Sequence, residues 1–383
     1  MTATELLTRR NAALPEIVEI LRAQQDAKLD VVSAARNLRV VGGSLRVANT
    51  VHQLTLAGVT SRDAVLTPTA SADADLATKL DIPLPYLRRL RAQKTDLYDT
   101  NVNAWLADKP DRRFLVRGLR DRDSLEPGVL RAMLSDSYRI VDNLDILMSV
   151  LEGIRRAGAQ VDITQADLTE THMYVKVRSR DIAEAAPALL EGYRSPFTGA
   201  SGADLPLIFA GFVVSNSETG QGRFKITPQL VVQVCNNGMT INRHALSEVH
   251  LGGKLDEGQI RWSTDTQATA LELIGKKARD AVSAFLDRDF VRGQIQAITA
   301  EAGVPIPQPT ETIEHVSKKL NFTNEQQEAV LRDFISGGAC TSGGVLHAVT
   351  SAAQRVENAD TAYEMESQGL RAMSLAAAHA TAH

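Results

Sequence analysis

The spacing of apolar residues changes from a helical to a strand-like pattern partway along the chain. Residues 4–36 carry apolar side chains at near-helical intervals and predict helical structure. The segment that follows, NLRVVGGSLRVAN, predicts a short β-type element that turns at Gly42-Gly43. From Arg112 onward, strand-like segments alternate with amphipathic helices, so the two parts of the chain predict different structures.

Residues 66–93 predict two short helices joined by a tight turn. Thr69 or Ser71 can cap the first helix, and two prolines begin the second. The pair has the spacing of a helix-turn-helix motif. However, Asp81 stands where that motif usually has glycine, and the prolines crowd the start of the helix that would enter DNA. We therefore expect a plain helical hairpin.

The central part of the chain predicts a sheet. RRFLVRGL is typical of a strand and PGVLRAMLS of a short helix. THMYVKVRS alternates strictly, which places Tyr174, Lys176 and Arg178 on one face of a strand. Two further long strands, PLIFAGFVVSNSE and RFKITPQLVVQVC, flank the turn at 219–222. Together these segments predict an antiparallel sheet of about four or more strands.

A long helical run over residues 263–301 carries one apolar stripe, which can close the open face of that sheet. After the linker 303–309, the remainder is helical, with Thr323 and Gln326 at the spacing of a capping box. The expected fold class is therefore α+β, with the sheet packed by a long helix and flanked by helical N- and C-terminal regions. The predicted divisions are 1–108, mainly helical with a short β segment; 109–302, the α+β core; and 303–383, helical with a frayed tail.

Composition identifies a folded protein without membrane or secretory features. Hydrophobic residues make up 44% and charged residues 23% of 383 positions, as in ordinary globular proteins. No apolar window is long enough for a membrane span, so we expect a cytoplasmic protein with reduced cysteines. The net charge of −4 argues against coating nucleic acid through bulk positive charge. A local basic groove stays open, because phosphates respond to charges within about 8 Å.

Familiar enzyme motifs give little support for chemistry. There is no GxxxxGK[ST] phosphate loop, and HLGGKLDEG does not connect a strand to a helix as a dinucleotide loop must, so no cofactor is expected. A metal or thiol site could use Cys235, His244 and His250, with Cys235 as a ligand or nucleophile. No tight ligand pair preorganises such a site. The alternative is that these are ordinary half-buried residues, with Cys235 ending an apolar strand.

Polar residues around the central turn form a second candidate site. Asn216, Glu218, Asn236 and Asn237 could make a polar constellation at one edge of the sheet. Turn chemistry is the competing interpretation, and it accounts best for Asn237, because Asn-Gly pairs accept left-handed backbone conformations. Asn216 and Glu218 are less easily explained in that way.

Basic residues gather on neighbouring predicted strands and give the most informative signal. The candidate nucleic-acid-binding residues are Arg112, Arg113, Arg117, Arg139, Lys176, Arg178, Arg223 and Lys225. If these strands lie side by side, the cations could neutralise phosphates while Tyr174, Phe212 and Phe224 stack on bases. The alternative is a solvated strand face paired with nearby aspartates.

Four separated motifs resemble one family. NSETG followed by a strand and VCNNGM, LATKLDIPLPYLRRL with NVNAWL upstream, SDSYRIVDN between them, and GGVLHAVTSAAQRV resemble the phage/plasmid-like proteins of the domain-of-unknown-function family numbered 932. The resemblance spans residues 65 to 360 or so. It implies a phage, plasmid or laterally transferred origin and assigns no catalytic residue. The expected core is also similar to that of phage single-strand annealing proteins.

These observations lead to one functional hypothesis, one alternative of a different class, and a third interpretation in which the helical C-terminal region serves a structural or partner-binding accessory protein. The hypothesis is a protein that binds single-stranded DNA, or anneals it, in recombination or replication. It would need no cofactor, would not contact membranes, and would act in the host cytoplasm if phage-encoded. We expect a homo-oligomer, because annealing must hold two strands extended. The alternative is a metal-dependent or thiol enzyme using Cys235, His244 and His250.

Overall fold

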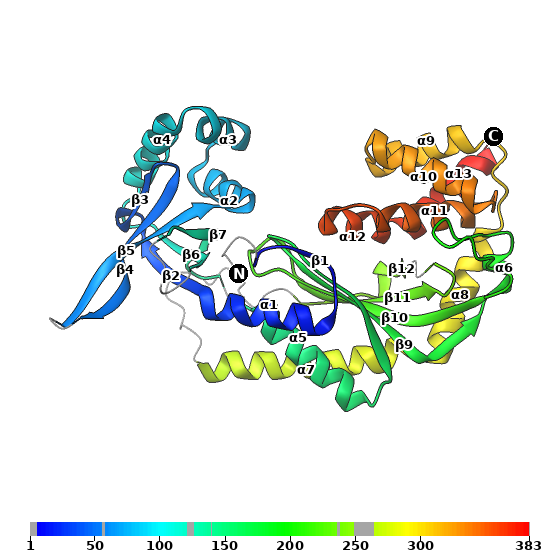
Figure 1. The fold of residues 1–383 in the computed structure, drawn as a ribbon. Coiled ribbons are helices and arrows are strands. Elements are labelled where there is room, and N and C mark those ends of the chain that lie inside the picture. Colours follow the sequence, from blue (N-terminus) through cyan, green and yellow to red (C-terminus); the bar gives the residue numbers. More distant parts are fainter. Residues whose placement is uncertain are drawn as a thin grey trace.

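The computed structural model describes residues 6–55, 58–120, 126–138, 140–235, 238–248 and 264–382 (Figure 1). It is an α+β protein with two sheets, which confirms the predicted fold class. Sheet A follows the order β1-β8-β9-β10-β11-β12, with β13 also pairing β11, and all its pairs are antiparallel. Its strands are β1 (Arg9–Ala12), β8 (Val161–Leu168), β9 (Met173–Ala185), β10 (Leu207–Asn216), β11 (Phe224–Val232), β12 (Gly238–Thr240) and β13 (Leu246–Glu248).

Helices cover both faces of sheet A. One face packs on α1, α5 and α7, through side chains such as Ile17, Leu147 and Val282. The other face packs on α8, α11 and α13, and α12 lies across it as well (Figure 1). These helices are α1 (Leu14–Ala27), α5 (Asn143–Ala157), α7 (Thr264–Phe285), α8 (Arg288–Ala302), α11 (Ser342–Gln354), α12 (Ala359–Ser367) and α13 (Gly369–Ala382). The short α6 (Pro187–Leu190) follows β9, and α9 (Pro309–Leu320) and α10 (Asn324–Gly337) complete the C-terminal helical layer.

Sheet B lies in the N-terminal part and follows the order β2-β6-β7-β5-β4-β3. Its strands are β2 (Lys28–Ala34), β3 (Leu38–Val41), β4 (Ser44–Thr55), β5 (Gly58–Pro68), β6 (Arg113–Leu119) and β7 (Gly128–Ser135). Three helices, α2 (Ala70–Leu80), α3 (Leu84–Gln93) and α4 (Thr95–Asp108), bury their apolar side chains against one face. Strands from either side of residue 108 share hydrogen bonds in this sheet. The three-part division of the chain stays a prediction.

Sheet B must curl, because its two outer strands are neighbours in the chain. Only the short 3-10 turn Ala35–Asn37 separates the end of β2 from the start of β3. Four residue steps span at most about 14 Å, whereas six strands laid flat would place their outer members about 24 Å apart. Ala35 N also donates to Arg112 O at 2.8 Å, which fixes the turn beside β6. The curl therefore brings β3 close to the start of β6.

Several predicted elements differ from the structure in type. Residues 28–34, expected to continue the first helix, form β2, and GVLRAMLS, expected as a helix, forms β7. β7 is buried on both faces, so its sequence lacks the alternation that marks a half-exposed strand. The long helical run 263–301 is two helices, α7 and α8. Asp287 caps the second by accepting from Phe290 N at 2.8 Å, and the break lets the chain pass to the other face of sheet A.

Candidate functional site

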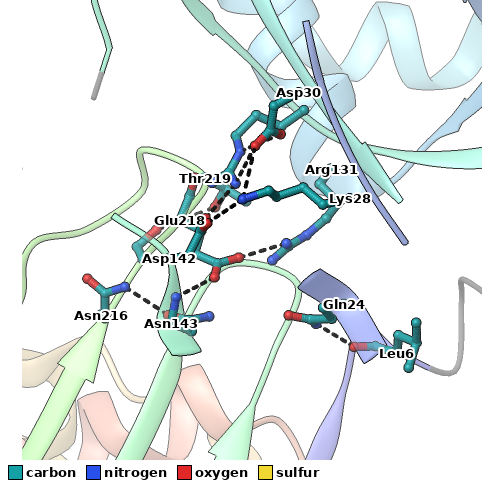
Figure 2. Close-up of polar contacts among 12 residues, drawn as sticks. Leu6, Gln24, Lys28, Asp30, Arg131, Asp142, Asn143, Asn216, Glu218 and Thr219 are labelled. Carbon is teal, nitrogen blue, oxygen red and sulfur yellow. Dashed lines mark hydrogen bonds and ion pairs between the residues drawn. The ribbon is translucent and has the colours of Figure 1, made fainter. Parts of the chain in front are cut away.

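The turn between β10 and β11 inserts into the junction between the two sheets (Figure 2). Glu218 is only 4% exposed there. Its Oε2 lies 2.7 Å from Arg131 Nη1 of β7, and its Oε1 accepts from Asn143 N, at the start of α5, at 2.5 Å. A carboxylate at a helix N-terminus is favourable, because the first amides of the helix have no partner inside it. Glu218 therefore joins β7 of sheet B to α5 beneath sheet A.

Arg117 of β6 is the centre of this junction. Its guanidinium donates to both carboxylate oxygens of Asp30 at 2.9 and 3.0 Å, to Asp142 Oδ1 at 2.7 Å and to Glu218 O at 2.7 Å. The side chain is 2% exposed. The prediction that Arg117 contacts nucleic acid is therefore wrong, because its hydrogen-bond donors are directed at buried partners and solvent cannot reach them.

The junction balances its own charge. Lys28 Nζ lies 2.6 Å from Asp142 Oδ2. Three cations thus face three carboxylates, namely Lys28, Arg117 and Arg131 against Asp30, Asp142 and Glu218. Burial alone would raise the pKa of Asp142, but the attraction of Arg117 and Lys28 outweighs it and lowers the pKa of that carboxyl. Each of these six side chains already has an ion-pair partner, and the network bridges sheet B and the elements of sheet A, so their charges are not available to a ligand.

Half of the predicted polar constellation takes part in this junction. Asn216 is fully buried at the end of β10, and its Nδ2 donates to Asn143 Oδ1 at 2.8 Å and to Val141 O at 3.2 Å (Figure 2). The structure therefore brings Asn216 and Glu218 together, inside the molecule. Asn236 and Asn237 lie outside the described residues.

Sequence reasoning missed the residues that surround Arg117 and Glu218. These are Lys28, Asp30, Arg131 and Asp142. One signal was available, because Arg131 is a lone charge inside the apolar run VLRAML. A charge that a sheet buries must find a partner, since an isolated buried charge is costly.

The basic face predicted on β9 exists, but other parts of the protein cover it. Tyr174, Lys176 and Arg178 share one face, opposite the apolar face that packs on α5 and α7. α12 lies on this basic face, with Glu366 Oε2 at 2.5 Å from Lys176 Nζ and Asp360 Oδ1 accepting from the Tyr174 hydroxyl at 2.9 Å. Lys176 is 16% exposed and is paired with a buried carboxylate, so a phosphate cannot replace its partner without moving α12.

The remaining members of the predicted groove on sheet A are dispersed. Arg178 lies 3.5 Å from Asp162 and stacks 5.0 Å from the ring of Phe209. Phe212 and Phe224, expected to stack on bases, are buried on the opposite face of the sheet. Arg223 and Lys225 are exposed at the start of β11, and Arg139 lies outside the described residues. A continuous groove of cations and aromatic rings is not formed on the described part of sheet A.

One predicted cation, Arg112, lies beside an aromatic side chain in the part of the protein built on sheet B. Arg112 and Arg113 are exposed where the chain enters β6. A pocket of about 150 Å³ opens there, and Trp105 of α4 lines it with its side chain 49% exposed. Arg112 lines the same pocket, donates from Nη1 to Lys79 O at 2.7 Å, and places its guanidinium 5.0 Å from the ring of Phe114. Lys79 and Lys109 add two more cations to the pocket wall. We call this set, Trp105, Arg112, Lys79 and Lys109, the Trp105 surface.

A wider cavity of about 920 Å³ lies between α2, the β8–β9 turn and the start of α12. Its charged lining residues are Arg9, Arg10, Arg88, Glu16, Glu170, Glu357 and Asp360. Arg9 is already paired with Glu16, and Arg10 with Asp167. With more carboxylates than cations in its wall, the cavity does not favour a polyanion.

The residues of the alternative enzyme site are dispersed in the described structure. Cys235 is buried, and its carbonyl accepts from Gln354 Nε2 at 3.3 Å. His244 meets the ring of Phe290 edge-on, with 5.5 Å between ring centroids. His250 lies outside the described residues. Among the residues that the structure places, no three His, Cys, Asp or Glu side chains gather in a way that could hold a metal ion.

Comparison with known proteins gives no relative for this chain. No family model matches it, no curated protein is significantly similar, and no solved structure shares its fold at a significant level. Within the described residues, no helix combines the length and apolar character needed to cross a membrane.

Proposed function

We propose that this is a single-stranded nucleic-acid-binding protein of phage or plasmid type that uses the Trp105 surface and acts in the cytoplasm without a cofactor. The observation that carries the proposal is a half-exposed indole beside three cations. Proteins that bind single strands without sequence preference combine aromatic platforms for bases with cations for phosphates. The family resemblance to phage/plasmid-like proteins of unknown function belongs to the same proposal.

The Trp105 surface is suited to a single strand because its parts are held in place. Trp105 lies on α4, whose Tyr98, Val102 and Leu106 are buried in the core between sheet B and helices α2–α4. Arg112 is fixed by its bond to Lys79 O and by its contact with Phe114. Three cations line the pocket against two carboxylates, those of Asp81 and Asp108, so a small positive excess faces the ligand. A preorganised platform loses little side-chain entropy on binding.

Fluorescence anisotropy with a labelled single strand and the matching duplex, over a salt series, tests the proposal. We expect preference for the single strand and a linear fall of log K with log salt. Trp105→Ala should weaken binding by about 1–3 kcal/mol, the usual contribution of one stacked base. Arg112→Gln should reduce the salt slope by about 0.7, the value of one phosphate contact in single strands. Equal binding by wild type and Trp105→Ala would contradict the proposed surface.

Two controls separate a surface effect from unfolding. Arg332→Gln removes a cation that is 66% exposed on α10, far along the chain from the Trp105 surface, and should bind like wild type. The chain has two tryptophans. In a Trp262→Phe background, emission reports Trp105 alone, and a stacked base should quench it. Binding without quenching would place the nucleic acid elsewhere on the protein.

Annealing activity would require copies of the chain to cooperate, and we propose a homo-oligomer built through the β4–β5 ribbon. From Val51↔Arg62 to Thr55↔Gly58, these two strands hydrogen-bond to each other, and no other described strand pairs with that stretch. The ribbon projects away from the body of the protein (Figure 1). Its two open edges carry unpaired backbone groups, which favour pairing with another strand.

A further inference from the structure

The β3–β4 hairpin places two arginines directly opposite each other. Gly42 and Gly43 both have positive φ, 59° and 75°, so they form the two-residue turn that gives a hairpin the right twist. A two-residue turn fixes the register, which pairs Val41 with Ser44 and, two steps further, Arg39 with Arg46. Both arginines are exposed, on the face of sheet B opposite α2–α4.

This arrangement is unfavourable without a counterion. Like charges on directly opposite strand positions repel, because their Cβ atoms are only about 5 Å apart. Among the described residues, neither Arg39 nor Arg46 has a carboxylate within ion-pair distance. The nearest acidic position along this face of β5, Asp63, accepts a hydrogen bond from Asn49 N at 3.2 Å. An anion held between the two guanidinium groups would relieve the repulsion.

The hairpin is also rigid, since α4 holds its turn and its outer edge. Asp99 accepts hydrogen bonds from Gly42 N at 2.6 Å and from Gly43 N at 2.9 Å. Asn103 accepts from Val40 N at 2.7 Å and donates to Val40 O at 2.8 Å, as a neighbouring strand would. These contacts stop the arginine pair from relaxing by movement of the backbone. The same helix carries Trp105, so the hairpin and the Trp105 surface share one support.

We infer that Arg39 and Arg46 form a phosphate-binding site that continues the Trp105 surface along the same nucleic-acid strand. The inference rests on the proposed function and adds the second contact point of the ligand. Ala35 lines the Trp105 pocket, and four residue steps separate it from Arg39, which is at most about 14 Å. Arg36, exposed and paired with Asp111, lies between them. Because the arginine pair faces away from α4, a strand stacked on Trp105 passes around the edge of sheet B beside Arg36 and reaches the pair within a few nucleotides.

The chemistry of the pair fits a backbone phosphodiester. Each guanidinium can donate two parallel N–H bonds to phosphate oxygens, and two facing guanidinium groups can hold one phosphate from both sides or two successive phosphates. Ser44 and Thr67 lie on the same face of the sheet as the arginine pair, with their hydroxyl oxygens 3.2 Å apart. Both hydroxyls can form hydrogen bonds to a sugar or phosphate. Contacts to backbone phosphates carry no sequence information, so binding through this pair should be independent of sequence.

The test compares Arg39→Gln/Arg46→Gln with Arg332→Gln in the anisotropy assay, using single strands of about 2, 8, 12 and 16 nucleotides. The expected result is a salt slope lower by about 1.4 for the double variant on the longer strands, the value of two phosphate contacts. The shortest strand, which occupies Trp105 alone, should bind the variant and wild type equally. Inorganic phosphate and a 5′-phosphorylated strand are included, because a site for free or terminal phosphate would respond to these and not to strand length.

The outcomes separate this inference from the proposed function. If Trp105 emission is quenched in the Trp262→Phe background and the double variant keeps the full slope at every length, the arginine pair is not a phosphate contact and the Trp105 surface stands. If no strand quenches Trp105 and none binds, the proposed function itself fails. If millimolar phosphate competes with the strand, and the difference between the double variant and wild type is the same at every strand length, the pair binds free phosphate and the inference is wrong. An unchanged thermal transition in the double variant shows that its fold is intact.

Discussion

Arg113 and Arg117 stand four residues apart on β6 and point to the same side of sheet B, yet their surroundings differ. Arg113 is 47% exposed, with Asp136 at 3.7 Å, whereas Arg117 is 2% exposed and bonded to Asp30, Asp142 and Glu218 O. Sequence treats them as one cluster. The structure assigns one to the surface and the other to the junction between the sheets.

This difference predicts unequal effects on stability. Arg117→Met should lower the free energy of unfolding by about 3–5 kcal/mol, because it leaves Asp30 and Asp142, both largely buried, with only Lys28 to balance two carboxylates. Arg113→Gln, the matched change on the same strand, should cost less than about 1 kcal/mol. Urea denaturation at neutral pH measures both. Similar costs for the two variants would show that the junction is solvated and not closed.

Asp75 of α2 predicts a stability change with pH. Its carboxylate is 8% exposed and accepts from Met133 N at 3.0 Å and Gln221 Nε2 at 3.1 Å. Burial, partly opposed by these hydrogen bonds, raises the pKa of Asp75 to about 6. Because the folded pKa is raised, Asp75 favours folding most below its ordinary pKa of about 4. That contribution is lost as the pH rises through about 6.

Asp75→Asn should remove this dependence. Relative to wild type, the variant should gain stability between about pH 4 and pH 6 and keep a constant advantage above that, of up to about 3 kcal/mol. Denaturation midpoints at a series of pH values give the difference curve. A difference that stays flat across this range would mean that the Asp75 carboxylate is hydrated in the folded protein.

At the scale of elements, the sequence correctly predicts the helix caps and turns that depend only on neighbouring residues. Thr69 caps α2 by accepting from Ala72 N, and Thr323 and Gln326 form the expected capping box at α10. The turn at Gly42-Gly43 was also predicted correctly. Each of these signals depends on residues within one turn, so no distant contact can override it.

Sequence failed where distant elements decide. Strict alternation placed Lys176 and Tyr174 on one face, which the structure confirms, but alternation cannot tell which element covers that face, here α12. β7 differs from the helix that its sequence predicts, because burial on both faces removes the apolar–polar alternation that marks a strand. The Trp105 surface was missed as a unit, because Lys79 of α2 joins Trp105 and Arg112 only through the packing of α2 and α4 against sheet B.

The β4–β5 ribbon predicts the oligomeric state. Replacing residues 50–61 with the dipeptide Asn-Gly shortens the ribbon but keeps the pairs from Leu45↔Leu66 to Val47↔Ala64, which belong to the core. Light scattering after size exclusion should show an oligomer for wild type and a monomer for this variant, because a lone two-stranded ribbon is stable only when another element covers it. An identical mass for both proteins would place the contact elsewhere.

At the scale of the whole molecule, the two sheets are joined by side chains of opposite charge. The turn that carries Glu218 extends from sheet A to sheet B, where Arg117 donates a hydrogen bond to Glu218 O and Arg131 forms an ion pair with the Glu218 carboxylate. Gln221 of the same turn contacts Asp75 of α2, so the connection extends to the helices that support the Trp105 surface. The candidate nucleic-acid surface is therefore connected to sheet A through side-chain contacts of the β10–β11 turn.

The position of Glu218 in the chain also sets an order on folding during synthesis. Glu218 O and Arg117 are 101 residues apart, and Asn143 N and the Glu218 carboxylate are 75 apart. When sheet B leaves the ribosome, Glu218 has not yet been synthesised, so Arg117 and Arg131 cannot bind it. Until the β10–β11 turn is made, Arg131 lacks the Glu218 carboxylate, whereas Arg117 can pair with Asp30 within sheet B, because domains fold from the N-terminus as they emerge. A nascent chain stalled before residue 218 thus presents an open, charged junction that the finished protein conceals.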